Sequence, residues 1–349
     1  MNKPVGIVAD NILLEHKIPA KTPECPDRLR KIYFDLNNNG FKKKPDMKKY
    51  DLRSLTDDEL FAVHSKFYID QIIKHSVSPN PFSYDKDTYL MEDSLYCAKM
   101  AAGGCIELAE AIVEGKIERG FALVRPPGHH ASIGRGSGFC ILNNIALTAQ
   151  HLINKCGLNR IMIVDFDVHH GDGTQEIFYD NDKVLFISLF QDNIFPFSGK
   201  PKEFGLNNGL GFNINIPVFP QYCDLEYKYI FGTVIRNIAE QYLPQIILVS
   251  AGFDGHVEDP MSEVCITTKG YIDFCEFLKY FASEFCDGKL LYVLEGGYKI
   301  PILEESIFNS LKTLLNPEVI LPGFGFSKRA NKHITTTLNE VFRYKWSIL

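Results

Sequence analysis

Acidic, histidine and tyrosine side chains follow four separate apolar runs of this sequence, at the points where buried strands would end. These polar groups occupy residues 125–130, 165–172, 251–254 and 295–298. In an open parallel sheet, ligands bind beyond the carboxyl ends of the strands, so the four groups are expected on one rim. Their coincidence predicts a catalytic site at that rim.

The segment 165–172 carries the residue types of a metal site. Along an extended backbone, alternate residues point to one side, so Asp165, Asp167 and His169 are expected to face the same way. Together with Asp254, the pair Asp167 and His169 would give a metal three protein ligands and an open position, as in a catalytic zinc site. A single strand-end aspartate is more often a helix cap, and only the joint pattern favours metal binding.

Two adjacent histidines and one tyrosine could supply proton transfer and charge stabilisation. His129 and His130 follow a Pro-Gly turn, and a neutral imidazole there could act as general base and acid. Such a histidine needs an orienting carboxylate, for which Asp165 and Asp172 are both candidates. Tyr298 could donate a hydrogen bond to an oxyanion. The alternatives are a buried histidine pair bonded to backbone and a tyrosine that only packs.

Short apolar runs alternate with segments of helical period along the chain. The runs are residues 5–9, 121–124, 160–166, 184–189, 212–218, 245–250 and 290–294, and the helical segments are 94–114, 144–155, 225–241 and 268–284. This alternation predicts a doubly wound α/β fold, with a mostly parallel central sheet and helices on both faces. Nothing divides the chain, so one domain is expected over residues 1–349. The basic stretches 42–49 and 328–333 are predicted to be a solvated loop and a surface turn.

Composition narrows the class of protein. Apolar residues make up 45% of the chain and charged residues 23%, as in a globular protein with a sizeable core. The net charge of −6 argues against general nucleic-acid or acidic-membrane binding, and no apolar run has the length of a membrane span. Nine cysteines without a CxxC pair and the absence of a classical signal at the N-terminus favour a cytoplasmic protein, with non-classical export left open.

These motifs resemble the zinc-dependent histone deacetylase superfamily, which includes acetylpolyamine amidohydrolases and bacterial deacetylases. The resemblance extends from residues 23–28 to 295–298, with further matches at 63–65, 87–89, 125–130, 138–140, 143–144, 165–173, 251–254 and 259–260. Arg-Pro-Pro-Gly-His-His and Leu-Glu-Gly-Gly-Tyr are similar to the class II branch. The resemblance implies a single arginase/deacetylase-like domain, with catalytic motifs over 23–298 and a C-terminal extension over 320–349.

The resemblance also implies roles for the residues of the rim. One zinc ion would be bound by the three ligands named above. His130, paired with Asp172, would be the general base and acid, and His129, paired with Asp165, would stabilise charge. Tyr298 would polarise an acetyl carbonyl.

A narrow channel for an alkyl chain is implied by the same resemblance. Phe139, preceded by Gly138, and Phe195 would flank the stem of acetyl-lysine. Asp87 resembles the rim acid that grips the substrate backbone, although Asp85 is close enough to compete for this role. Family members also bind structural potassium, which here suggests a first site at Asp165, Asp167, His169, Ser188 and Leu189 and a second at Phe178, Asn181 and Val184.

Two departures from the family pattern bear on the substrate. Polyamine-selective members carry an acid at the position of Met261, and its absence weakens a polyamine assignment. Phe197 is bulkier than the usual residue and could reshape the rim. The sequence therefore predicts a zinc hydrolase that releases acetate from acetylated lysine, in a peptide or protein. The alternatives are a hydrolase of acetylated small amines such as acetylpolyamines, a two-manganese ureohydrolase and a silent acetyl-lysine reader, and the oligomeric state is left open.

Overall fold

One eight-stranded parallel sheet forms the centre of the molecule. The computed structural model describes residues 3–18, 22–40, 46–76 and 80–348. The strand order across the sheet is β2-β1-β5-β10-β9-β6-β7-β8, and every neighbouring pair is parallel. The strands are β1 (Val5–Val8), β2 (Met47–Lys49), β5 (Arg119–Ala122), β6 (Ile161–Asp165), β7 (Val184–Gln191), β8 (Asn213–Val218), β9 (Ile246–Ala251) and β10 (Leu290–Leu294).

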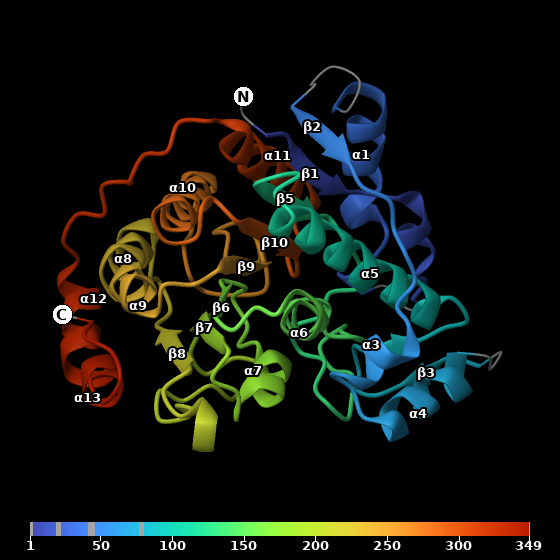
Figure 1. The fold of residues 1–349 in the computed structure, drawn as a ribbon, viewed down its shortest axis with the longest axis horizontal. Helices are drawn as coiled ribbons and strands as arrows, with labels where there is room; N and C mark the ends of the chain where they lie inside the picture. Colours follow the sequence, from blue (N-terminus) through green and yellow to red (C-terminus); the bar gives the residue numbers. More distant parts are fainter. Residues whose placement is uncertain (1–2, 19–21, 41–45, 77–79, 349) are drawn as a thin grey trace.

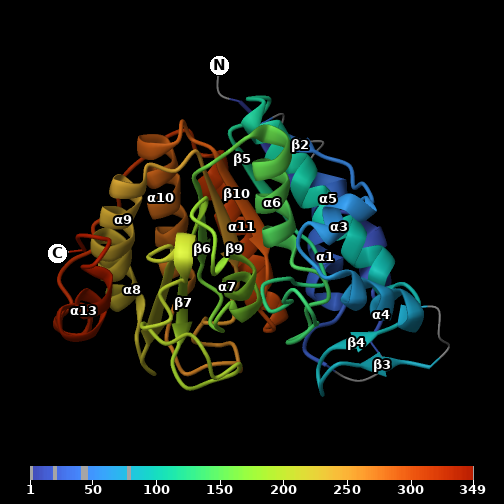
Figure 2. The same ribbon diagram turned by 60° about the horizontal axis from the view of Figure 1, so that its bottom comes forward.

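Helices cover both faces of this sheet, as Figures 1 and 2 show. One side carries α5 (Ser94–Val113) and α6 (Asn144–Cys156), and the other carries α8 (Asp224–Ile230), α9 (Arg236–Tyr242) and α10 (Thr268–Phe285). Every residue of the strands from β5 to β10 is buried, which explains their continuous apolar sequences. The predicted α/β class, with one parallel sheet between helical layers, is therefore confirmed.

The remaining elements are short or lie around this core. They are α1 (Asp27–Asp35), α3 (Asp57–Phe61), α4 (Lys66–Ser76), α7 (Asp172–Phe178), α11 (Ile300–Leu315), α12 (Lys328–His333), α13 (Asn339–Phe342), the antiparallel pair β3 (Phe82–Ser83) and β4 (Tyr89–Leu90), and the single turns η1 (Asn11–Glu15), η2 (Leu36–Gly40), η3 (Asn207–Gly209), η4 (Phe231–Ile235) and η5 (Ile334–Leu338). The single helix expected over 225–241 is α8 and α9 joined through the π-helical turn η4. No helix in the described parts of the chain is both long and apolar enough to cross a membrane.

Two predictions for basic stretches were wrong. Met47–Lys49 forms the edge strand β2, because Met47 turns into the core while the two lysines stay exposed, and residues 42–45 lie outside the described chain. Lys328–His333 is a helix, α12, whose first turn is capped by the Ser327 side chain. Only two of its side chains, Ala330 and His333, are buried. Two buried positions among basic and polar residues are too few to show a helical period, so the segment was mistaken for a turn.

The C-terminal segment packs along the outer edge of the sheet. Figure 1 shows it in red beside α8 and α9, and α12 contacts α8. The Trp346 indole donates a hydrogen bond of 2.6 Å to the Gly211 carbonyl, and Phe342 stacks on Phe204. Trp346 also contacts Phe212 and His333 contacts Phe219, so the segment packs against residues on either side of the edge strand β8.

Candidate active site

The four polar groups predicted from the sequence follow four neighbouring strands. β5, β10, β9 and β6 lie next to one another in the sheet. Parallel pairing aligns their carboxyl ends, with Asp165 opposite Ser250 and Leu294 opposite Ala251. The segments that leave these strands therefore emerge at one edge of the sheet, as the strand-end rule predicted.

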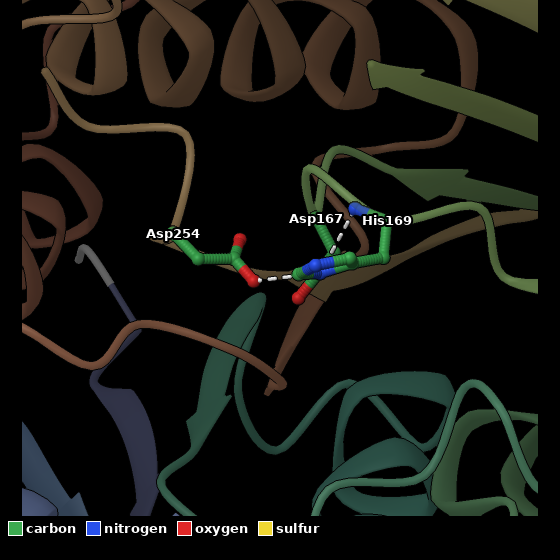
Figure 3. A group of neighbouring side chains, drawn as sticks. All are labelled: Asp167, His169 and Asp254. Carbon is green, nitrogen blue, oxygen red and sulfur yellow. Dashed lines mark hydrogen bonds and ion pairs between the residues drawn. The ribbon is translucent and has the colours of Figure 1, made fainter. Parts of the chain in front are cut away.

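Asp167, His169 and Asp254 converge at this edge (Figure 3). One donor atom from each of the three lies within 4.8 Å of the other two, and all three residues are buried. His169 Nδ1 lies 3.1 Å from Asp167 Oδ1 and 3.1 Å from Asp254 Oδ2. This is the one group of at least three such donors within the described residues.

Backbone amides orient the two carboxylates. Gly296 N donates to Asp167 Oδ2 over 2.8 Å, and Val168 N donates to Asp254 Oδ1 over 3.1 Å. A Cβ atom at Gly296 would collide with both carboxylates, so only glycine allows this close approach. Asp254 Oδ2 and Asp167 Oδ1 are left facing His169.

Electrostatics at this trio fit a cation site. Burial opposes the charged form of His169, yet its bonds to Asp167 and Asp254 raise its pKa from 6.5 to about 10. Burial and the charge of Asp167 raise the pKa of Asp254 to about 6. Two buried carboxylates and one imidazole form a donor set that suits zinc with an open position, so the residues fit the implied metal.

The two histidines each bond a different carboxylate. His129 Nδ1 lies 3.0 Å from Asp165 Oδ2, and His130 Nδ1 lies 2.7 Å from Asp172 Oδ1. The two imidazole rings have centroids 4.0 Å apart. The structure thus resolves which carboxylate belongs to which histidine, a choice that the sequence pattern alone left open.

The two imidazoles differ in charge. Burial, together with the charge of His129, lowers the pKa of His130 to about 4, so His130 is neutral near pH 7. Burial would also lower the pKa of His129, but the charges of Asp165 and Asp167 raise it well above its ordinary value. One histidine is therefore a neutral base and the other a cation.

Tyr298 stands beside this group on the turn after β10. Its backbone N–H donates to Asp259 Oδ2 over 2.7 Å, and the Arg28 guanidinium lies 4.9 Å from its ring centroid. Arg28 also donates to the Gly297 carbonyl over 2.7 Å. Burial raises the pKa of the Tyr298 phenol well above 10, which keeps the hydroxyl protonated as a donor.

A pocket of about 160 Å³ opens at His169, one of the three metal-type donors. It is lined by Lys86, Asp87, His130, Gly138, Phe139, His169, Phe195, Met261 and Tyr298. The predicted channel residues and the neutral histidine therefore share one cavity.

Asp87 and Asp85 have different surroundings. Asp85 accepts hydrogen bonds from the Asp87, Thr88 and Gly138 amides, so its carboxylate is used inside the loop. Asp87 lines the pocket mouth with its side chain 42% exposed. Of the two candidates, Asp87 has its carboxylate at the rim, where it pairs with the Lys86 ammonium over 3.9 Å.

The residues suggested for potassium fall into two places. Asp165 and Ser188 are paired across β6 and β7, and Leu189 follows in β7. The Ser188 hydroxyl is buried and has no hydrogen-bond partner in the described structure. The second group lies along the chain from the end of α7 into β7, at Phe178, Asn181 and Val184.

Glu295 is a site residue whose role sequence reasoning missed. It is fully buried, and its Oε2 accepts hydrogen bonds from Gly128 N (2.7 Å) and His129 N (3.2 Å). Its Oε1 accepts from the Ser250 hydroxyl over 3.2 Å. A charged residue at the end of an otherwise apolar strand was the signal that could have identified it.

Comparison with known proteins gives consistent matches. The histone deacetylase domain model matches residues 22–314. The chain is 34% identical to a probable deacetylase of Archaeoglobus fulgidus over 98% of both sequences. It is 38% identical to histone deacetylase 15 of Arabidopsis thaliana, over 90% of this chain and 57% of the plant protein. The crystal structure of the HDA15 HD domain aligns with a TM-score of 0.89 and 34% identity, covering 99% of this chain and 95% of that one.

Proposed function

The chain belongs to the histone deacetylase family, and we propose that its rim pocket is a single-zinc site that removes acetyl groups from acetylated lysine side chains. Membership makes the chain a deacetylase, a hydrolase that acts on amides. The proposal concerns the metal, the roles of the side chains and the substrate. The observation that carries it is one pocket lined by a neutral histidine, a protonated tyrosine and His169, which belongs to the three-donor metal group.

Asp167, His169 and Asp254 would bind the zinc ion. When bound, zinc supplies Lewis-acid polarisation of the acetyl carbonyl and lowers the pKa of an attacking water. The protein contributes the fixed orientation of both carboxylates through the Gly296 and Val168 amides. These amides stabilise the ligand geometry in the way that outer-sphere hydrogen bonds do in metal sites.

His130 would move the protons of the reaction. As a neutral imidazole whose Nδ1 faces Asp172, it can accept a proton from the attacking water at Nε2. Asp172 stabilises the imidazolium that results, and the same proton is then available for the departing amine. His129, held in its charged form by Asp165, stabilises negative charge beside this transfer.

Tyr298 would stabilise the oxyanion of the tetrahedral intermediate. Its hydroxyl is protonated, and its backbone is fixed by the Asp259 carboxylate and the Arg28 guanidinium. A donor that is already oriented costs no reorganisation when charge develops, which is worth roughly 3–4 kcal/mol for a single donor.

The pocket walls favour an uncharged alkyl stem. Phe139, Phe195 and Met261 supply an apolar lining, and Asp87 offers a carboxylate at the mouth for the backbone amides of a peptide. Lys86 lies at the same mouth, 3.9 Å from the Asp87 carboxylate, and this ion pair weakens the attraction of the mouth for the cationic tail of a polyamine. These features support acetyl-lysine over acetylpolyamine.

A substrate panel tests this proposal. Acetyl-lysine peptides, longer acyl-lysine peptides and acetylated polyamines would be compared by kcat/KM with the zinc-loaded protein. The highest value is expected for acetyl-lysine, and a preference for acetylpolyamine would reverse the substrate assignment. Zinc-loaded protein that binds acetyl-lysine peptides without releasing acetate would instead indicate a reader.

Metal stoichiometry separates the remaining alternatives. One zinc ion per chain is expected, whereas two tightly bound manganese ions would indicate the ureohydrolase. We also propose a structural potassium ion beside Asp165, supported by the unpartnered Ser188 hydroxyl described above. Potassium should then raise the unfolding temperature more than sodium at equal ionic strength.

A further inference from the structure

A buried polar network joins the metal-bearing loop to the wall of the pocket. Its centre is His170, which follows the metal-type donor His169 and is 1% exposed. His170 Nδ1 lies 2.8 Å from Ser198 Oγ, and its Nε2 lies 3.2 Å from both Gln175 Oε1 and Asn215 Oδ1. The network thus connects the loop after β6, helix α7, strand β8 and the loop after β7.

Hydrogen-bond chemistry assigns the proton on His170. Gln175 Nε2 donates to the Glu203 carboxylate over 2.8 Å, which fixes the amide with its oxygen toward His170. Asn215 Nδ2 donates to Gln175 Oε1 over 2.7 Å, so its own oxygen also faces the imidazole. His170 Nε2 therefore carries the proton, and Nδ1 is left to accept a hydrogen bond from the Ser198 hydroxyl.

The far end of the network anchors the loop after β7. Gly199 N donates to Glu203 Oε2 over 3.2 Å, and Asn215 Nδ2 donates to the Lys200 carbonyl over 3.3 Å. Gly199 has φ +87, and a Cβ there would lie 2.7 Å from His170 Cγ, so the loop rests directly on the imidazole. The residues from Ser198 onward are therefore held by several part-buried hydrogen bonds.

The pocket wall just before this anchor has weaker support. Phe195 is 37% exposed and Phe197 is 73% exposed, although the Phe195 ring lies 5.0 Å from that of His130. Among the described residues, the first side-chain hydrogen bond after Phe195 is the one that joins Ser198 to His170. The bond to His170 therefore adds a fixed anchor to the ring contacts that Phe195 makes with His130 and His169.

We propose that His170 is a positioning residue that sets the width of the pocket lined by Phe195, by accepting a hydrogen bond from the Ser198 hydroxyl and holding the Phe195 segment against the loop of His169. This inference rests on the proposed deacetylase site. It adds a determinant of acyl-group selectivity that does not touch the substrate. Phe195 lines the same pocket as His130 and His169, so a wall held in this way would limit the room for acyl groups longer than acetyl.

The variant Ser198→Ala removes the proposed bond with the smallest change of shape. The KM for an acetyl-lysine peptide should rise while kcat changes less than about twofold, and kcat/KM for butyryl-lysine relative to acetyl-lysine should rise at least about threefold. The control is Ser310→Ala, which removes a hydroxyl bond far from the pocket, from a buried serine to the Ser306 carbonyl in α11. Its selectivity ratio should equal that of the parent protein.

Two substitutions of His170 separate its two nitrogens. His170→Asn places an amide oxygen near the Nδ1 position and can still accept from Ser198, so it should keep most of the acetyl selectivity. His170→Gln places its amide near the Nε2 position and leaves Ser198 without its acceptor, so it should reproduce Ser198→Ala. Zinc content is measured for both variants. Only a variant that retains one zinc ion per chain shows whether a change in selectivity comes from the position of the Phe195 segment.

Hydrogen exchange gives a readout that needs no turnover. The Phe197 amide bonds the Ile194 carbonyl and the Gly199 amide bonds Glu203, so exchange of peptides spanning 195–203 should accelerate in Ser198→Ala and not in Ser310→Ala. Unchanged exchange together with an unchanged selectivity ratio in Ser198→Ala would overturn the inference, as would equal loss of turnover with both acyl groups. If the parent protein were inactive on every acyl-lysine, the proposed function would be refuted. The hydrogen-exchange comparison of Ser198→Ala with the parent protein would still test the role of His170.

Discussion

Glu295 offers a sharp test of how the catalytic turn is held. Its carboxylate accepts the buried amides of Gly128 and His129 and the hydroxyl of Ser250. In Glu295→Gln, the amide oxygen can accept both backbone donors, and the NH₂ group can donate to the Ser250 hydroxyl. In Glu295→Leu, both backbone donors lose their acceptor in a fully buried site.

The magnitudes differ enough to be decisive. Each buried amide left without a partner costs about 1–3 kcal/mol, so Glu295→Leu should lower the free energy of unfolding by roughly 2–6 kcal/mol. Glu295→Gln should cost about 1 kcal/mol or less. Urea unfolding measures both, and Glu240→Leu at an exposed position of α9 is the control, with an expected change within about 0.5 kcal/mol.

Turnover provides the second half of this test. Because Glu295 holds the backbone of His129, Glu295→Leu should lose most acetate release even at temperatures where it is folded. Glu295→Gln keeps the turn and should retain far more activity. Equal stability of the two variants would refute the reasoning, since it would mean that the Gly128 and His129 amides do not depend on this acceptor.

Three further predictions follow from buried groups and from the pocket mouth. Burial lowers the pKa of His64 from 6.5 to about 4. The neutral imidazole therefore stabilises the fold above pH 6.5. This contribution to the free energy of unfolding, up to roughly 3 kcal/mol, is lost as the pH falls toward 4. The difference between parent and His64→Gln in urea unfolding at pH 7 and pH 5 measures it, and an equal loss in both would contradict it. Gly296→Ala, whose Cβ would collide with Asp254 and Asp167, should weaken zinc binding at least about tenfold in chelator competition; parent-like affinity would exclude this crowding. Met261→Glu should raise kcat/KM for acetylspermidine relative to an acetyl-lysine peptide about tenfold, and an unchanged ratio would remove Met261 from the account of selectivity.

The sequence predicted the parts of the site that depend on strand ends. Asp167, His169 and Asp254 follow continuous apolar runs, and parallel strands bring their carboxyl ends together whatever the details of the loops. The same reasoning placed the histidine pair and Tyr298 at that edge. These predictions needed only periodicity and the order of strand and helix, which residue types along the chain report directly.

The parts that depend on contacts between distant loops were not predictable in this way. Which carboxylate faces which histidine depends on how the turn at 128–130 lies over the segment 165–172, and residue spacing carries no information on that. Glu295 was visible as a charge after an apolar strand, but the two backbone amides that bond its carboxylate lie more than 160 positions away. The strand β2 was missed because a three-residue edge strand with one buried side chain has too short a pattern to distinguish it from a loop.

In the proposed mechanism, one zinc ion on Asp167, His169 and Asp254 works with His130 to hydrolyse acetyl-lysine. The most direct measurement is acetate release from an acetyl-lysine peptide, with the metal content of the same samples determined for the parent protein and for His130→Ala. The account predicts one zinc ion per chain in both proteins and loss of most acetate release in the variant. Parent-like turnover by His130→Ala at full zinc content would contradict it.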